Sequence, residues 1–347
     1  YKKDEITQFH MDIASSIQSV TEEIVLRLTK SIAKEQGTKN LCMAGGVALN
    51  CVANGKILKE KIFEKIWIQP AAGDAGGAVG AAYAAYHREC GGTRLGTTGD
   101  SMHGAYLGSE FDQQEIERQL NACGATFTTH SFDEVISCTA EALANEKTVG
   151  WFQGRMEFGP RALGGRSILA DARSSTMQRN LNLKIKYRES FRPFAPSVMV
   201  EDVQKYFDLD RPSPYMMLVA DVSKDLQRTM TPEEVELFGT EKINVARSSI
   251  PAVTHVDYSA RVQTVDARTN PRFHALISTF REITGSSVLV NTSFNVRGQP
   301  IVESPTDAFQ CFMGTGLDIL AIGNSILIKE NQTIDSIKNY REQYELD

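Results

Sequence analysis

One basic stretch of the sequence, residues 154–193, could surround an anion. It holds seven arginines and two lysines: Arg155, Arg161, Arg166, Arg173, Arg179, Lys184, Lys186, Arg188 and Arg192. The whole chain of 347 residues nevertheless carries a net charge of −6. Glycine and proline interrupt the stretch, which is typical of a concave loop and not of a solvated helix face. We expect several guanidinium groups to converge on a multiply charged anion. An exposed loop with scattered surface arginines is the alternative.

Two further pairs of residues could join the same site. Lys186 and Arg188 stand two apart, and in an extended segment such positions point the same way, so we expect both side chains on one face. Ser293 and Asn295 repeat this spacing at the end of a predicted strand. A simple Asx or Ser turn is the alternative for that pair alone. No convincing nucleophile–base pattern accompanies these residues, which indicates electrostatic and positional catalysis on phosphate chemistry.

Two consecutive strand–turn–helix units precede the basic stretch. The apolar run LCMA leads into Gly45-Gly46 and Asn50, and the run IWIQP leads into a turn that contains Asp74. Turns of this kind leave backbone N–H groups at a helix N-terminus, where a phosphate or a nucleotide edge can bind. Glycine that lets a helix pack close to a strand is the alternative. From this segment alone, Asp74 is interpreted as a helix cap.

Periodic apolar residues predict the elements that position these groups. Residues 7–36 predict a long amphipathic helix with apolar positions at Ile13, Ile17, Val20, Ile24, Val25, Leu28 and Ile32. Further helices are expected over residues 111–123, 132–145, 271–284 and 306–315, and strands over 148–152, 215–222, 287–290 and 317–327. This mixture predicts an α/β fold, and the length suggests about two domains.

Composition excludes several classes of protein. The sequence contains no run of about 18 apolar residues, so no transmembrane helix is expected. Six scattered cysteines without a C-x-x-C pair are typical of buried thiols in a reducing compartment, so we expect a cytoplasmic location. A pI near 5.7 disfavours non-specific binding to nucleic acid. The first residues are polar and begin without methionine, so we expect a fragment or a processed product.

Six segments taken together resemble the NodU/CmcH/TobZ-type O-carbamoyltransferases over essentially the whole chain. They are MAGGVALN (43–50), GDAGGAVGAA (73–82), GWFQGRMEFGPRALGGRSILADAR (150–173), IKYRESFRPFAPSV (185–198), HVDYSARVQTV (255–265) and VNTSFN (290–295). The pair GPRALGGRS and FRPFAPS is highly specific, and the order of all six segments fits.

The resemblance implies two lobes and a two-step reaction. Residues 1–105 would be the C-terminal half of an ATPase-like carbamoyl-transfer lobe of the actin/sugar-kinase/Hsp70 type, with its N-terminal half absent. Residues 106–347 would be a YrdC-like α/β lobe. There, ATP with Mg²⁺ and carbamoyl phosphate would give carbamoyl adenylate. The first lobe would then pass the carbamoyl group to a substrate hydroxyl.

The resemblance also assigns residues. Lys186, Arg188, Ser293 and Asn295 would be catalytic. The carbamoyl phosphate or adenylate phosphate would be bound by Arg161, Arg192 and Arg261, with Arg155 and Arg166 in support. Glu157 is expected to pair with one of these arginines. Gly45, Gly46 and Asn50 would contact ATP or its adenosine.

For Asp74 the resemblance replaces the cap by a metal ligand. In the family, Fe²⁺ or another divalent metal would be held with two histidines in H-x-x-x-H. No two of the six histidines here are four apart, so that motif would belong to the absent half.

Two alternatives remain open: a non-catalytic nucleotide-binding module that regulates a partner, and a hydrogenase-maturation carbamoyltransferase, whose C-x-x-C modules are not visible here. A sugar kinase would not explain the arginines. The expected partners are small molecules, namely ATP, carbamoyl phosphate and a hydroxyl-bearing acceptor, with neither nucleic acid nor a membrane. The sequence leaves a homodimer and the identity of the acceptor open.

Overall fold

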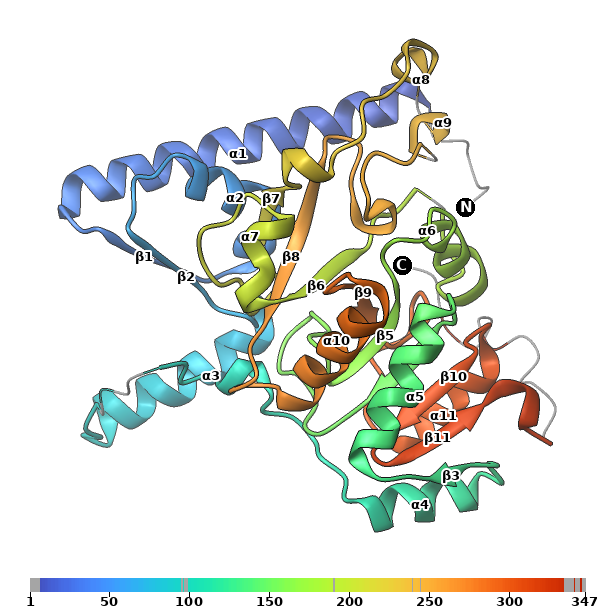
Figure 1. Cartoon of the computed structure of the whole chain (residues 1–347). Helices are drawn as coiled ribbons and strands as arrows, with labels where there is room; N and C mark the ends of the chain where they lie inside the picture. Colours follow the sequence, from blue (N-terminus) through green and yellow to red (C-terminus); the bar gives the residue numbers. More distant parts are fainter. Residues whose placement is uncertain are drawn as a thin grey trace. The chain divides into compact units, whose positions relative to one another are not determined.

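The computed structural model describes residues 7–94, 96, 99–189, 191–238, 240–243, 245–333, 340 and 344. It confirms the α/β class and divides the chain into two compact units (Figure 1). Unit 1 comprises Tyr1–Thr93 with Met217–Val219, and unit 2 comprises Arg94–Met216 with Ala220–Asp347. The predicted boundary between residues 105 and 106 falls inside unit 2. Within the described part of the chain, no helix is both long and apolar enough to cross a membrane.

Unit 1 contains the two expected strand–turn–helix units. Its elements are α1 (Gln8–Gln36), β1 (Asn40–Met43), α2 (Cys51–Lys59), β2 (Lys65–Ile68) and α3 (Asp74–Ala84). Strands β1 and β2 pair in parallel, so the turns that follow them meet at one edge. The backbone N–H of Gly45 donates to the carbonyl of Ala72 at 2.7 Å, which joins the two turns directly.

Helix α1 forms where its apolar period predicted, but most of that apolar face is exposed. Only Glu22, Val25 and Thr29 are buried on this helix. The exposed apolar positions run from Phe9, 68% exposed, to Ile32, 44% exposed, and the others are Met11, Ile13, Ile17, Val20, Ile24 and Leu28. A contiguous apolar stripe of this kind is unusual on a free surface.

Unit 2 is built on a large mixed sheet. Its strands run in the order β3-β11-β10-β4-β5-β9-β6-β8-β7, and the edge strand β7 spans Leu218–Asp221. Their bounds are β3 Thr128–Thr129, β4 Val149–Phe152, β5 Arg166–Asp171, β6 Ala195–Met199, β8 Ser259–Val265, β9 Val288–Ser293, β10 Ile319–Ile322 and β11 Ser325–Ile328. The helices of unit 2 are α4 Gln113–Ala122, α5 Phe132–Ala144, α6 Met177–Asn180, α7 Val203–Tyr206, α8 Pro232–Glu236, α9 Thr240–Ile243, α10 Pro271–Thr284 and α11 Pro305–Gly314.

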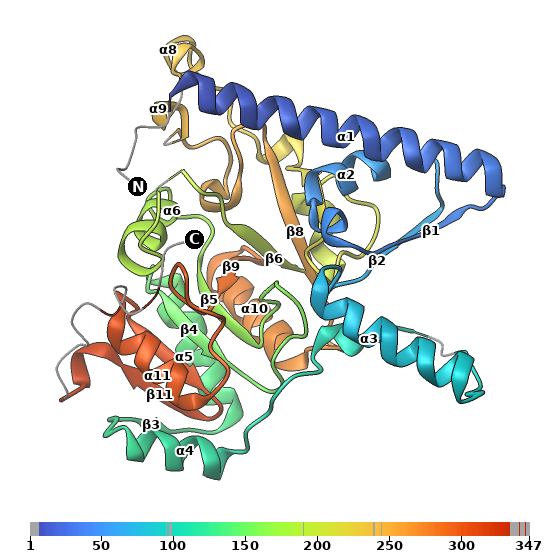
Figure 2. The ribbon, with the colours of Figure 1, turned by 180° about the vertical axis from the view of Figure 1, so that it is seen from behind.

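The main core of unit 2 lies between this sheet and the helix pair α5 and α10, which pack side by side (Figures 1 and 2). Alternate residues of the strands reach into it, among them Trp151 of β4, Leu169 of β5 and Leu289 of β9, all fully buried. Side chains alternate between the two faces of a strand, so these positions define one face of the sheet. The same face continues past the helices, where it becomes polar.

The exposure of α1 predicts how unit 1 responds to substitution. Replacing Ile17 and Ile24, 62% and 52% exposed, by glutamine should change the free energy of unfolding by no more than about 0.5 kcal/mol each. Ile57→Ala in α2, whose side chain is 0% exposed, should cost roughly 2–5 kcal/mol. Urea denaturation of the chain measures both. Equal losses would mean that the stripe is packed in solution, for example against a second copy.

Candidate functional site

A loop over residues 159–165 covers the polar half of the sheet face, and side chains from three strands hold its carbonyl groups. Asn291 of β9 donates to the Ala162 carbonyl at 3.1 Å, and Gln263 of β8 donates to the Leu163 carbonyl at 2.7 Å. The indole N–H of Trp151 donates to the Gly164 carbonyl at 3.0 Å. These contacts hold the loop that carries Arg161 against β4, β8 and β9.

Glu157 and Gly164 fix the shape of this loop from within. The Glu157 carboxylate accepts backbone N–H groups of Leu163 at 2.6 Å and of Gly165 at 2.7 Å. The described hydrogen-bond partners of Glu157 are backbone groups, so it forms no direct ion pair with an arginine side chain. The expected pairing survives only as a charge interaction: the Glu157 carboxylate opposes the lowering of the Arg166 pKa by burial. Gly164 has a φ of +107°, and a Cβ there would meet the ring of Phe273 at 2.3 Å. Only glycine satisfies both conditions.

Four of the predicted arginines line one pocket of about 320 Å³ in unit 2. They come from separate segments: Arg161 from the loop, Arg188 and Arg192 from the basic stretch and Arg261 from β8. Ser293 lies at the end of β9 on the same wall. We call this space the arginine pocket; its described lining contains no carboxylate. Such a site suits a multiply charged anion.

Lys186 lies buried beneath the arginine pocket, next to the Ser293–Asn295 pair. Its Nζ approaches the Ser293 carbonyl at 2.6 Å, Ser293 Oγ at 3.1 Å and Asn295 Oδ1 at 2.7 Å. Burial, and secondarily the neighbouring Arg188 guanidinium, lower the pKa of Lys186 to about 7. The structure thus brings the two predicted residue pairs together through one ammonium group.

The backbone that presents Lys186 and Arg188 is not extended, as the sequence reasoning assumed. Residues Leu181–Ile185 form one turn of π-helix, and Lys186 itself keeps a helical conformation. Tyr187 then takes a φ of 49°, in the left-handed region. Because of this change of backbone direction at Tyr187, the Lys186 side chain lies against Ser293 while the Arg188 side chain lines the arginine pocket. A positive φ at a tyrosine costs backbone energy and is maintained by its surroundings.

Asn182 bonds to Arg188 and Arg192, and the sequence reasoning did not identify it as a site residue. Its side-chain oxygen accepts from Arg188 Nε at 2.7 Å, and its amide donates to the Arg192 carbonyl at 2.9 Å. Arg188 also lies 5.0 Å from the centre of the Phe194 ring. Burial and the nearby Arg192 lower the pKa of Arg188 to about 10. No sequence spacing marks Asn182, because its partners meet it only through the π-helical turn.

Asn291 and Gln263 were missed as well, although a signal existed. Each stands two residues from a predicted site residue in the same strand, Asn291 before Ser293 and Gln263 after Arg261. Both are almost fully buried, and Asn291 donates to Gln263 at 2.8 Å. A polar residue two positions from a predicted ligand, inside an apolar strand, would have indicated a support on the same face.

Arg155 and Arg166, the two expected supporting arginines, lie outside the lining of the arginine pocket. Arg155 forms an ion pair with Glu110 at 3.3 Å, and its side chain is 54% exposed. Arg166 is fully buried and lies 3.5 Å over the ring of Phe152. It donates to the carbonyls of Ser109, Gln153, Gly154 and Gly165 at 3.1–3.3 Å. Its contacts clamp the β4–β5 connection to residue 109.

In unit 1, the expected nucleotide turn and metal ligand occupy the edge where β1 and β2 end. Gly45 has a φ of 99° and precedes the short 3₁₀ turn that begins at Gly46. Asn50 caps α2 by accepting from the Ala53 N–H at 3.1 Å, and its amide donates to Gln18 at 3.0 Å. Asp74 is exposed and opens α3, for which Gly73 is the N-cap.

The described residues do not by themselves fit a metal ion at Asp74. Among them, no three His, Cys, Asp or Glu side chains come close enough to hold one. A single carboxylate is a poor site for a divalent transition metal, which takes several nitrogen or oxygen ligands.

Two family models match most of the chain. A family model described as "Carbamoyltransferase C-terminus" matches residues 140–329, and one described as "Carbamoyltransferase N-terminus" matches residues 1–83. The chain belongs to the carbamoyltransferase family. The C-terminal match contains every residue of the arginine pocket lining.

Several curated relatives from this family are similar over most of the chain. An uncharacterized protein of Synechocystis is 55% identical over 99% of this chain, and the nodulation protein NolO of Bradyrhizobium diazoefficiens is 40% identical over 93%. A 3'-hydroxymethylcephem-O-carbamoyltransferase of Streptomyces clavuligerus is 34% identical over 77%. The matches cover 56%, 55% and 44% of those relatives, so the chain spans about half their length.

Among solved structures, full-length HypF in its phosphate- and nucleotide-bound form matches 61% of this chain and 23% of its own, with 18% identity. Its TM-score of 0.33 is too low to support an argument about either unit.

The contacts of Arg166 predict that it supports stability. Arg166→Met would remove four buried hydrogen bonds to carbonyl groups and should lower the free energy of unfolding by roughly 2–4 kcal/mol. Arg118→Met on the surface of α4, where the arginine is 67% exposed, should leave the free energy of unfolding nearly unchanged. Chemical denaturation compares the two. Equal stabilities would contradict the clamp.

The lowered pKa of Lys186 predicts a pH-dependent affinity for anions. Its ammonium form prevails below about pH 7 and attracts an anion in the arginine pocket, whereas the neutral amine above that pH does not. Sulfate keeps its charge in this range, so its affinity, measured by calorimetry, should fall roughly three- to tenfold between about pH 6 and pH 9. Lys186→Met should flatten this profile. If the sulfate affinity of the wild type does not change with pH, the titration of Lys186 does not control anion binding.

Proposed function

We propose that the arginine pocket activates a carbamoyl group by joining it to AMP. The observation that carries the proposal is the convergence of four guanidinium groups above the buried Lys186 ammonium, with no carboxylate in the described lining. Membership of the carbamoyltransferase family supports it, because a carbamoyl group must be activated before transfer. The substrates would be ATP, entering with Mg²⁺, and carbamoyl phosphate.

The chemistry accounts for the charge of the pocket. A carbamoyl carbonyl resists attack because its nitrogen donates electrons into it, and an adenylate supplies a good leaving group. Water would cleave the mixed anhydride bond of carbamoyl phosphate, giving carbamate and inorganic phosphate. A carbamate oxygen would then attack the α-phosphorus of ATP, and pyrophosphate would leave. Both steps gather several anionic groups, which fixed guanidinium groups can stabilise without rearranging.

Each part of the site has a role in this proposal. Arg161, Arg188, Arg192 and Arg261 would hold the phosphate oxygens. Lys186 bonds to both Ser293 and Asn295 and would set the position of the Ser293 hydroxyl on the pocket wall. No paired acid and base is needed, because the reaction depends mainly on orientation and on charge stabilisation.

The second half-reaction would use the rest of the family fold. One relative is named as an O-carbamoyltransferase acting on a hydroxymethylcephem, which favours a hydroxyl acceptor here too. The turn with Gly45, Gly46 and Asn50 would contribute to the transfer lobe, and Asp74 stands beside it at the start of α3. The chain spans about half of its relatives, so we assign the transfer step only to the whole protein.

The direct test is release of pyrophosphate. We expect the chain with ATP, Mg²⁺ and carbamoyl phosphate to release pyrophosphate only when all three are present. Arg188→Gln and Arg261→Gln should each lower the rate by roughly 10²–10³-fold, because each removes a charged donor aimed at the reacting phosphates. An enzyme-coupled pyrophosphate assay measures this.

Arg118→Gln, on the exposed face of α4, is the matched control and should keep the wild-type rate. ATP binding without any pyrophosphate release would overturn the proposal and favour a nucleotide-binding module. Variants of Arg188 and Arg261 that match the wild type would mean that the reaction occurs elsewhere.

A further inference from the structure

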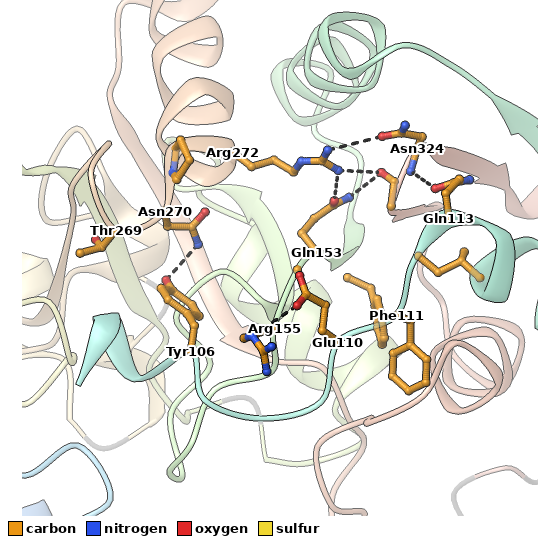
Figure 3. Close-up of a pocket in the computed structure, with 15 residues that line it drawn as sticks. Tyr106, Glu110, Phe111, Gln113, Gln153, Arg155, Thr269, Asn270, Arg272 and Asn324 are labelled. Carbon is orange, nitrogen blue, oxygen red and sulfur yellow. Dashed lines mark hydrogen bonds and ion pairs between the residues drawn. The ribbon is translucent and has the colours of Figure 1, made fainter. Parts of the chain in front are cut away.

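Unit 2 contains a second polar cavity, of about 470 Å³, that shares no lining residue with the arginine pocket (Figure 3). It lies where β4 ends, where α10 begins and where β10 turns into β11. Its volume is within the range of small-molecule sites. Nothing in the proposed reaction uses it.

The environment of Arg272 on one wall is electrostatically unusual. Arg272 stands in the first turn of α10, where backbone N–H groups already make the local potential positive and where no acidic residue is present. Its NH1 donates to Gln153 Oε1 at 2.5 Å and to the Gly323 carbonyl at 3.3 Å, and its NH2 approaches Asn324 Oδ1 at 3.5 Å. All of these partners are neutral, and burial lowers the pKa of the guanidinium.

No carboxylate is bonded to Arg272 among the residues that the structure describes. The charged groups of the cavity lining are Arg272, Arg155 and Glu110, a net charge of +1. Glu110 is paired with Arg155, and both of these side chains are about half exposed. In Figure 3, Arg272 reaches from α10 towards Gln153 and Asn324, while Arg155 lies beside Glu110 on another part of the wall. One positive charge, on the half-buried Arg272, is therefore left without a bonded acid among the described residues.

We propose that this cavity binds a small organic molecule through a single carboxylate, with Arg272 as its principal partner. One carboxylate neutralises the net charge of +1, and a guanidinium is well shaped to bind it. The rings of Phe111 and Phe152, whose centres are 6.1 Å apart, supply an apolar wall for the body of the ligand. A phosphate dianion would overcompensate the charge and belongs in the arginine pocket.

Crystals of the chain soaked separately in 4-bromobenzoate, in 4-bromobenzamide and in selenate test the proposal. The benzoate carries a carboxylate and a bromine that anomalous scattering can locate, and the benzamide has nearly the same shape without the charge. We expect a bromine peak in the cavity with the benzoate and none with the benzamide. Selenate should give its peak in the arginine pocket and so report that the anion sites are accessible.

Variants tie the site to Arg272. Arg272→Gln should weaken benzoate binding in calorimetry roughly ten- to hundredfold, the loss expected for one charged hydrogen-bond partner. Arg268→Gln is the matched control, because this nearby arginine is 88% exposed and pairs with Asp266. Arg155→Gln, on an exposed side chain, should weaken binding less and keeps the test valid if Arg272→Gln unfolds the protein.

Three results would overturn the proposal. One is a bromine peak absent from the cavity while selenate occupies the arginine pocket. Another is equal binding of the benzoate and the benzamide. The third is an affinity for the benzoate that survives in a folded Arg272→Gln variant. Failure of this site would leave the pyrophosphate assay unaffected, since the two cavities share no lining residue.

Discussion

Repulsion between like charges is the constraint on which the arginine pocket depends. Arg161, Arg188, Arg192 and Arg261 share one small space, with Lys186 buried beneath them. Neutral oxygens stabilise Lys186 and Arg188, namely those of Ser293, Asn295 and Asn182. Glu189, next to Arg188 in the chain, pairs with Arg192 and with Arg297. Burial and the neighbouring positive charges keep the pKa values of Lys186 and Arg188 low, because both disfavour the charged forms.

The fold can maintain this arrangement because one face of the sheet is divided into two halves. Under α5 and α10 its residues are apolar and pack into the core. Farther along the same strands, Asn291, Gln263 and Ser167 are buried instead and bond to the 159–165 loop. Each held carbonyl would otherwise be buried without a partner, at a cost comparable to a lost hydrogen bond. The position of Arg161 thus depends on the packing of the whole core.

Much of the secondary structure was predictable, because it follows local periodicity. α10 begins and ends where the apolar pattern placed it, at residues 271 and 284. The strand predicted over residues 287–290 forms as β9 but continues to Ser293. The sequence also placed Lys186 near Ser293 and Asn295, and its ammonium group bonds to both, whereas Arg188 only shares the pocket lining with Ser293. The prediction of an extended backbone at residues 186–188 was wrong. The π-helical turn before Lys186 and the positive φ of Tyr187 produce no recognisable pattern in the sequence. The exposed stripe of α1 likewise follows the predicted period but lacks the predicted burial.

By itself, the sequence determined the chemistry that is present: an excess of arginine within residues 154–193, the S-x-N pair, the two glycine turns and the family motifs. Only the tertiary structure decided which arginines work together. Arg155 and Arg166 stand in the same stretch as Arg161, yet one is paired at the surface and the other is a buried clamp. Arg261, a hundred residues away, joins Arg161 instead. The physical reason is that charge is carried by residue type, whereas convergence depends on strand register and on which buried carbonyl groups each side chain must satisfy.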